Sequence, residues 1–231
     1  MPVHIFSDDA RDRLSRCPPD ILPEDITAFF TLSIADREFL CPVRGAANQL
    51  GVALQLGLLR YLGLCPDDLQ DAPAHAVDYL ARQLGVAPQV LTHYGARAQT
   101  RTDHLRAVQQ YLGFRDADMF DLQALEVWLL ERALEHDKPT LLFGQAVGKL
   151  QADKIMRPGV TRLERLVAAA RSAAWAETFR CATLLLTPER RALLDGLLRP
   201  DPRTNQAPLI WLRLGATSNT PTAIRQALVK R

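Results

Sequence analysis

The sequence predicts an all-α protein, and three observations support that fold class. Apolar residues recur three and four positions apart along most of the 231 residues, the spacing of one face of a helix. The alternation of apolar and polar residues that marks a half-buried strand is not sustained anywhere. Most of the 15 prolines fall between the periodic stretches, where they end one helix and begin the next. We therefore expect helices connected by short loops.

The helices can be placed in order because breaks and start signals bound each periodic stretch. The longest apolar run, Leu50 to Leu59, is about half the length that spans a membrane and indicates a buried core helix. The three tryptophans, Trp128, Trp175 and Trp211, fall on apolar faces and are expected in the core. The predicted helices are 8–16, 24–31, 34–40, 46–62, 74–84, 88–95, 101–112, 121–136, 140–152, 161–184, 188–198, 206–213 and 221–230.

Start and stop signals support individual boundaries. Gly85 follows the stretch 74–84 at the position where many helices end in a left-handed residue. Thr187 precedes Pro188, which is the order of an N-cap and a first helical residue. Three further starts carry Ser or Thr with an acidic residue three positions later, as in a capping box: Ser33 with Asp36, Thr100 with Asp103, and Thr161 with Glu164.

Composition favours a soluble globular protein of the cytoplasm. Hydrophobic residues make up 48% of the chain and charged residues 23%, an ordinary globular balance. The first sixteen residues are polar and mixed in charge, unlike a signal peptide, and no apolar run is long enough for a membrane span. We therefore expect a cytoplasmic protein without a membrane partner.

Residues that carry enzyme chemistry are not arranged in any recognisable motif. The four cysteines form no C-x-x-C pair, and the five histidines lack the helical spacing of metal ligands. Residues 144–149 read G-Q-A-V-G-K, one residue short of a phosphate loop, and Leu150 stands where Ser or Thr is needed. The sequence therefore predicts no catalytic residue, metal, cofactor or small-molecule substrate.

The charge distribution points to a polyanionic partner. The formal net charge is only +2, but residues 151–231 hold 14 basic and 6 acidic side chains, a net +8. Residues 1–40 hold 4 basic and 8 acidic side chains, a net −4. A basic module of this kind suits nucleic acid, although a solvated basic helix face gives the same count.

The segment from Val77 to Tyr94 has the pattern of a helix-turn-helix. Ala81 is small enough for close helix packing, Gly85 allows the sharp turn, and Leu91 would pack inward from the second helix. The second helix of such a unit lies in the major groove. Outward polar residues that are placed to reach bases or phosphates are Gln89, Thr92, His93, Arg97 and Arg101. A helical hairpin without any DNA role stays open as the alternative.

A second unit of the same kind spans Leu141 to Ala170. Its first helix has an apolar stripe through Phe143 and Leu150, and its second buries Leu163 and Val167. Basic residues gather around the second helix start, where the helix itself favours anions. Lys154 and Arg157 lie in the turn, and the residues expected to face DNA on the helix are Thr161, Arg162 and Arg165.

Several separate segments together resemble the N-terminal region of the Tn-three family of replicative transposases, often catalogued as a domain of unknown function. The segments extend over nearly the whole chain in the family's order and spacing. They are Asn48 to Leu56 with Leu59-Arg60-Tyr61, Tyr79 to Val86, Tyr94, Arg97 and Thr100 to Leu105, Tyr111 to Arg115, Trp128 to Arg132, Pro158-Gly159, and Thr161 with Leu163 to Val167. Leu62 departs from the family, which commonly has Pro before Gly63.

The resemblance implies recognition of transposon terminal inverted repeats by tandem helical DNA-binding units, with double-stranded DNA as the partner. We expect these units at 1–117 and 118–231, each with one helix-turn-helix-like element. The family's metal-dependent Asp-Asp-Glu domain has no counterpart in this sequence, so we expect end binding without cleavage. The alternative is a helical protein-interaction module or truncated transposase that binds an intact transposase, or itself, and thereby regulates transposition.

Overall fold

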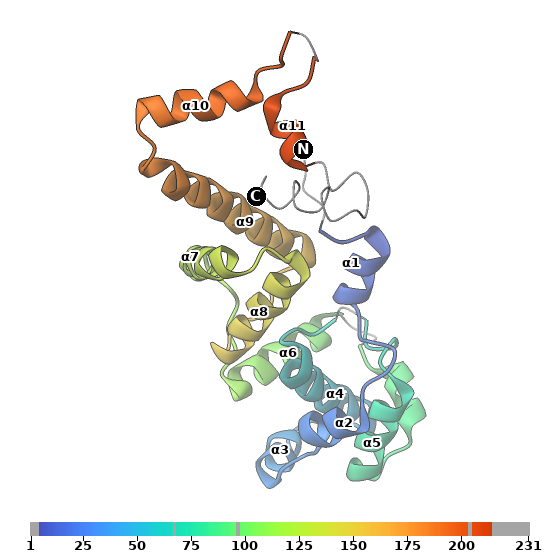
Figure 1. The fold of residues 1–231 in the computed structure, drawn as a ribbon. Helices are drawn as coiled ribbons and strands as arrows, with labels where there is room; N and C mark the ends of the chain where they lie inside the picture. The colour runs from blue at the N-terminus through green and yellow to red at the C-terminus, as the bar shows by residue number, and fades with distance from the viewer. Residues whose placement is uncertain (1–4, 67, 96–97, 203–204, 214–231) are drawn as a thin grey trace. The chain divides into compact units, whose positions relative to one another are not determined.

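The computed structural model describes residues 5–66, 68–95, 98–202 and 205–213, and their regular elements are all helices (Figure 1). The predicted all-α class is thereby confirmed. One isolated parallel bridge joins Arg115 to Ile155 without forming a strand. Within the described ranges, no helix combines the length and apolar content needed to traverse a membrane.

The predicted helices up to residue 213 are all present, each within three residues of its expected bounds. The predicted helix 221–230 lies outside the described residues. The elements are α1 (Asp8–Ser15), α2 (Pro23–Phe30), α3 (Ile34–Leu40), α4 (Ala46–Leu62), α5 (Ala74–Leu84), the 3₁₀ helix η1 (Pro88–His93), α6 (Ala98–Leu112), α7 (Met119–Glu135), α8 (Pro139–Ala152), α9 (Val160–Leu184), α10 (Pro188–Leu198) and α11 (Pro208–Arg213). They form two compact units, Met1–Trp175 and Ala176–Arg231.

Helix α4 forms the centre of the first hydrophobic cluster in unit 1, with α2, α5, η1 and α6 packed around it. Every residue from Leu50 to Leu59 is buried, as predicted. Two glycines let aromatic rings approach the α4 backbone. A Cβ at Gly51 would lie 2.3 Å from the Tyr94 ring, and one at Gly57 would lie 2.4 Å from the Phe30 ring.

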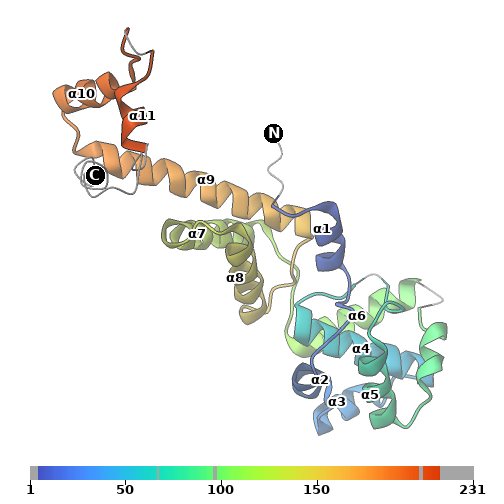
Figure 2. The same cartoon turned by 45° about the vertical axis from the view of Figure 1, so that its right-hand side comes forward.

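A second cluster in unit 1 is built by α7, α8 and the first part of α9 (Figure 2). Phe143 and Leu150 of α8 and Leu163 and Val167 of α9 are buried, which confirms the apolar stripes predicted there. The N-terminal segment adds to this cluster, because the Phe6 ring meets the Phe143 ring edge-on with centroids 4.9 Å apart.

Two buried carboxylates hold unit 1 together, and only one was predicted in its role. Asp36 completes the predicted capping box with Ser33 and also accepts hydrogen bonds from Arg60 and Tyr111. Glu164, expected to cap α9 with Thr161, instead accepts from the backbone N–H groups of residues 5 and 6 and from the Arg11 guanidinium. The Thr161 cap is wrong because α9 begins one residue earlier, at Val160.

Other predictions fail at α6 and at one tryptophan. Thr100 is not an N-cap, because α6 already begins at Ala98. Trp128 is partly buried against the second cluster, but Trp175 is 53% exposed, so its predicted place in the core is wrong. The Trp211 side chain lies outside the described residues.

Unit 2 contains the end of α9 with α10 and α11. Thr187 caps α10 as predicted, since its hydroxyl accepts from the Arg190 N–H at 3.4 Å. No described side chain of this unit is buried. Leu185 is 83% exposed and Leu193 is 73% exposed, so the apolar side chains here face outward.

Candidate nucleic-acid interface

The turn after α5 has the geometry expected of a helix end in a left-handed glycine. Gly85 has a φ of 67°, and its N–H donates to the Arg82 carbonyl at 3.3 Å. The Val86 N–H reaches back to the Ala81 carbonyl at 3.0 Å, which completes a Schellman motif. The chain therefore leaves α5 sharply at the predicted position.

The second element of the predicted helix-turn-helix from Val77 to Tyr94 is a 3₁₀ helix, η1, where an α-helix over 88–95 was expected. Leu91 inside η1 and Tyr94, the residue that follows it as the C-cap, are both buried and stand three residues apart, the repeat of a 3₁₀ helix. The Tyr94 N–H donates to the Leu91 carbonyl at 2.8 Å, the matching i to i+3 bond. The burial of both residues against α4 explains the tighter winding.

Polar residues of η1 face outward, as predicted. Gln89, Thr92 and His93 are exposed, and the Thr92 hydroxyl donates to the Gln89 carbonyl at 2.8 Å. Arg97 lies outside the described residues. Arg101, in the first turn of α6, is partly buried and lies alongside Gly95, and its carbonyl accepts from the Gln55 amide. The predicted helix-turn-helix thus exposes three polar side chains on η1, which is only six residues long.

The turn between α8 and α9 is fixed by backbone contacts with other parts of unit 1. Lys154 has a φ of 57°, and its carbonyl accepts from the Arg115 N–H at 3.0 Å. The Met156 N–H donates to the Arg115 carbonyl at 2.8 Å, and the Arg157 N–H donates to the Gly63 carbonyl at 2.9 Å. The start of α9 is therefore held at a defined position.

Exposed basic side chains surround the start of α9. Arg162 and Arg165 are exposed on its first two turns, with Thr161 beside them, and the exposed Lys154 has its Nζ 4.8 Å from the centre of the Phe114 ring. None of the three basic residues forms an ion pair within the part of the chain that the structure describes. Their charges add to the positive end of the helix dipole, so this surface attracts anions.

Arg157 differs from its neighbours because its guanidinium is largely buried. Its Nη2 donates to the Leu14 carbonyl, and burial lowers the pKa of the side chain to about 10. The side chain lines a cavity of about 190 Å³ together with Ser15, Cys65 and the residues that lead into α9. Sequence reasoning placed Arg157 with the exposed arginines and missed this burial, because the covering residues come from distant segments.

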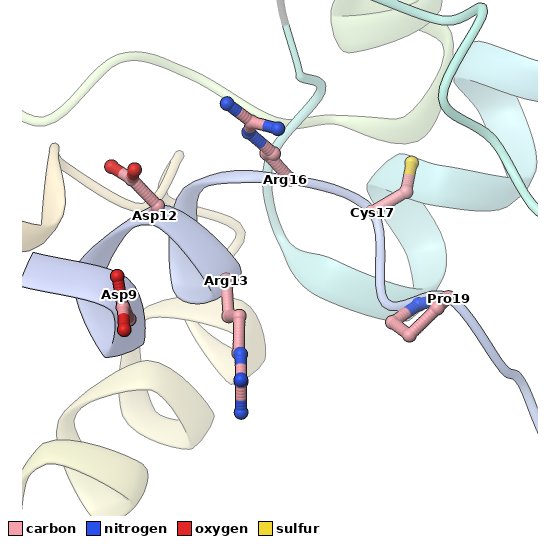
Figure 3. Close-up of a pocket in the computed structure, with 6 residues that line it drawn as sticks. All are labelled: Asp9, Asp12, Arg13, Arg16, Cys17 and Pro19. Atoms are coloured by element: carbon pink, nitrogen blue, oxygen red, sulfur yellow. The ribbon is translucent and has the colours of Figure 1, made fainter.

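A second hollow, of about 340 Å³, lies along α1 and the loop after it. Two aspartates and two arginines line it with Cys17 and Pro19. Figure 3 shows that Arg13 and Arg16 point in opposite directions, so the charged groups do not converge on a ligand. In the described ranges, no three His, Cys, Asp or Glu side chains gather where they could hold a metal ion.

Comparison with known proteins identifies the family. The model of the family "Domain of unknown function (DUF4158)" matches residues 5–170. The chain belongs to this family. The match includes both turn elements described above and the start of α9.

Related proteins are transposases. The chain is 31% identical over 197 residues to the transposase for transposon Tn1546 of Enterococcus faecium, covering 83% of this chain and 20% of that protein. It is 33% identical over 195 residues to the Tn501 transposase of Pseudomonas aeruginosa, with the same coverage, and 30% identical over 211 residues to the Tn21 transposase of Escherichia coli, covering 90% and 21%. This DUF4158 chain thus spans about one fifth of the length of these relatives, consistent with the N-terminal region of Tn-three family transposases.

Proposed function

We propose that this chain binds the terminal inverted repeats of a transposon and is the end-recognition part of a transposase. The observation that carries the proposal is the exposed basic surface at the start of α9, formed by Lys154, Arg162 and Arg165. Similarity to transposases supports a role in transposition. In this proposal the chain binds DNA ends without cutting them, and the strand-transfer chemistry belongs to a separate catalytic domain.

Contacts in this proposal divide between phosphates and bases. An α-helix fits the major groove, so the first turns of α9 would place Thr161, Arg162 and Arg165 against base edges. Lys154 and Arg101 would contact phosphates and fix the register. The η1 residues Gln89, Thr92 and His93, with Arg97, would form a second and weaker contact area. Two areas on one chain raise the overall affinity through effective concentration.

The test is a fluorescence-anisotropy titration with a duplex of the cognate inverted repeat and a scrambled duplex, at several salt concentrations. We expect tighter binding to the inverted repeat and a steep fall of affinity with salt, because phosphate contacts release counterions. Equal binding to both duplexes, or no binding, would overturn the proposal.

The basic surface of α9 is tested with a double variant. Arg162→Ala with Arg165→Ala should weaken binding by about 1–3 kcal/mol per lost base contact and flatten the salt dependence by about one unit of slope per lost phosphate contact. The matched control removes two exposed arginines elsewhere, Arg44→Ala with Arg106→Ala, and should bind like the wild type. Equal effects of the two double variants would show that only overall charge matters.

A second function is favoured by the exposed apolar side chains. Phe120 and Val127 on α7 are 73% and 62% exposed, in addition to the outward leucines of unit 2. Such side chains suit a protein interface. In this second proposal the chain binds an intact transposase or another copy of itself and regulates transposition. Binding to a co-expressed transposase without salt-sensitive duplex binding would favour it.

A further inference from the structure

The positively charged side chain of Arg157 takes no part in the base contacts proposed above. Its Nη2 is paired with the Leu14 carbonyl, but its Nε is buried without a hydrogen-bond partner. Within the described parts of the chain no carboxylate forms an ion pair with it. Buried charges in proteins are ordinarily paired with an opposite charge. This guanidinium departs from that rule among the described residues.

Of the described residues that line the cavity, Arg157 is the only charged one, among mostly apolar neighbours, so it determines the charge of a ligand bound there. A guanidinium presents N–H donors in a planar fork that matches phosphate and carboxylate oxygens. Gly159 and Val160, at the start of the 25-residue helix α9, line the same cavity. The N–H groups of a helix's first turn have no partner within the helix, and the dipole there is positive. The Arg157 guanidinium and the start of α9 therefore both favour a negatively charged ligand in this cavity.

The size of the cavity limits what the anion can be. Pockets for drug-sized ligands measure about 300–1,000 Å³. The cavity at Arg157 measures about 190 Å³, so it suits a single phosphate group better than a whole nucleotide. Thr161 and Arg162, which face outward, follow directly after the residues that line it. A phosphate held there would lie next to the proposed base-reading surface.

We infer that the cavity beside Arg157 is a phosphate-binding site, and that a backbone phosphate of bound DNA occupies it. The assignment of the phosphate to DNA rests on the proposed function. Arg157 then fixes the register of α9 on the duplex by holding a phosphate inside the cavity, while the exposed Arg162 and Arg165 contact the bases. We therefore expect phosphate-bearing ligands to protect the side chains that line the cavity from chemical labelling.

Cys65 provides the readout because it lines the same cavity. In a protein carrying Cys41→Ser and Cys181→Ser, the remaining thiols are Cys65 and Cys17. Cys17 is buried, and burial, with the nearby charge of Asp71, raises the pKa of its thiol to about 11, so it reacts slowly. The rate of maleimide labelling of Cys65 is then followed by mass spectrometry of the full chain.

Three conditions distinguish the sources of phosphate: chloride, inorganic phosphate at the same ionic strength, and the inverted-repeat duplex. Saturating duplex should slow the labelling of Cys65 by about ten-fold or more, and inorganic phosphate should slow it at higher concentration. Phosphate should also raise the melting temperature relative to chloride. Duplex binding that leaves the labelling rate unchanged would overturn the inference and leave the proposed function standing. Protection by phosphate without duplex binding would overturn the proposed function and the DNA source of the phosphate.

Variants of Arg157 assign the effect to this side chain. Arg157→Met should abolish protection, and phosphate should no longer raise its melting temperature. Arg157→Lys keeps the charge without the planar fork and should retain weaker protection, and it carries the test if the methionine variant does not fold. Arg106→Met removes an exposed arginine and should be protected like the wild type. Full protection in both Arg157 variants would overturn the inference.

Discussion

At the scale of the residue, Gly85 allows a clean test of backbone strain. Its φ of 67° lies in the left-handed region, and a Cβ there would meet no atom within 4 Å. Only the backbone conformation opposes a side chain at this position. We expect Gly85→Val to lower the free energy of unfolding by about 1–2 kcal/mol, measured by urea titration.

Gly148 is the control for adding a Cβ in open surroundings without a positive φ. It lies inside α8 in equally open surroundings and without a positive φ. Gly148→Ala should therefore raise the free energy of unfolding by about 0.5–1 kcal/mol, because alanine loses less conformational entropy in a helix. A Gly85→Val protein as stable as the wild type would show that the turn does not require a left-handed residue.

Asp36 gives the folded state a predictable dependence on pH. Burial raises the pKa of its carboxyl, but hydrogen bonds from Arg60, Ser33 and Tyr111 outweigh burial and bring the pKa to about 2. The unfolded value is about 3.9, so the carboxylate stabilises the fold fully only above about pH 5, where the unfolded carboxyl is ionised as well. This contribution, between about 2 and 3 kcal/mol, should be lost progressively as the pH falls from about 5 to below 2.

Asp36→Asn tests this dependence. Urea unfolding at pH 7 should show the variant at least about 2 kcal/mol less stable than the wild type, with the gap narrowing between pH 4 and pH 2. Asp20→Asn, at an exposed aspartate, should follow the wild type at every pH. A gap that stays constant down to pH 2 would contradict the assigned pKa.

At the scale of the element, Glu164 of α9 anchors the N-terminal segment. Its carboxylate accepts from the Phe6 N–H at 2.9 Å and from the Arg11 Nε at 2.7 Å. Glu164→Ala should release residues 5–16 from α9 and speed amide exchange in α1 while α4 stays protected. Hydrogen exchange with mass spectrometry measures both. Glu131→Ala, at an exposed glutamate of α7, should leave α1 unchanged; equal exchange of α1 in the two variants would refute the anchoring role.

Sequence periodicity was sufficient to locate the helices, because period-three and period-four burial is a local property. Start signals were less reliable. Ser33 and Thr187 are caps, whereas Thr100 and Thr161 lie inside helices that begin earlier. Glu164 and Arg157 could not be placed from sequence, because their partners at residues 5, 6, 11 and 14 are about 150 positions away. The exposed residues at the start of α9 were predictable because they alternate with a buried apolar stripe.

At the scale of the whole molecule, the two units should differ in stability. Unit 1 has two hydrophobic clusters, whereas no described side chain from Ala176 onward is buried. Helices without a packed face are marginal in water. Amides of α10 should therefore exchange orders of magnitude faster than those of α4 in native-state hydrogen exchange. Comparable protection of the two helices would indicate that α10 is covered in solution, for example by self-association, which sedimentation would detect.

The contact between Gly51 and the Tyr94 ring has a consequence for the history of the family. Because even a methyl group at position 51 would overlap the ring, neither position can change freely while the other stays as it is. In an alignment of many relatives, a larger residue at the first position should occur together with a smaller one at the second. The same coupling should link Gly57 with Phe30. These pairs would then record, in substitutions accepted over evolution, how closely the helices of the first cluster must approach.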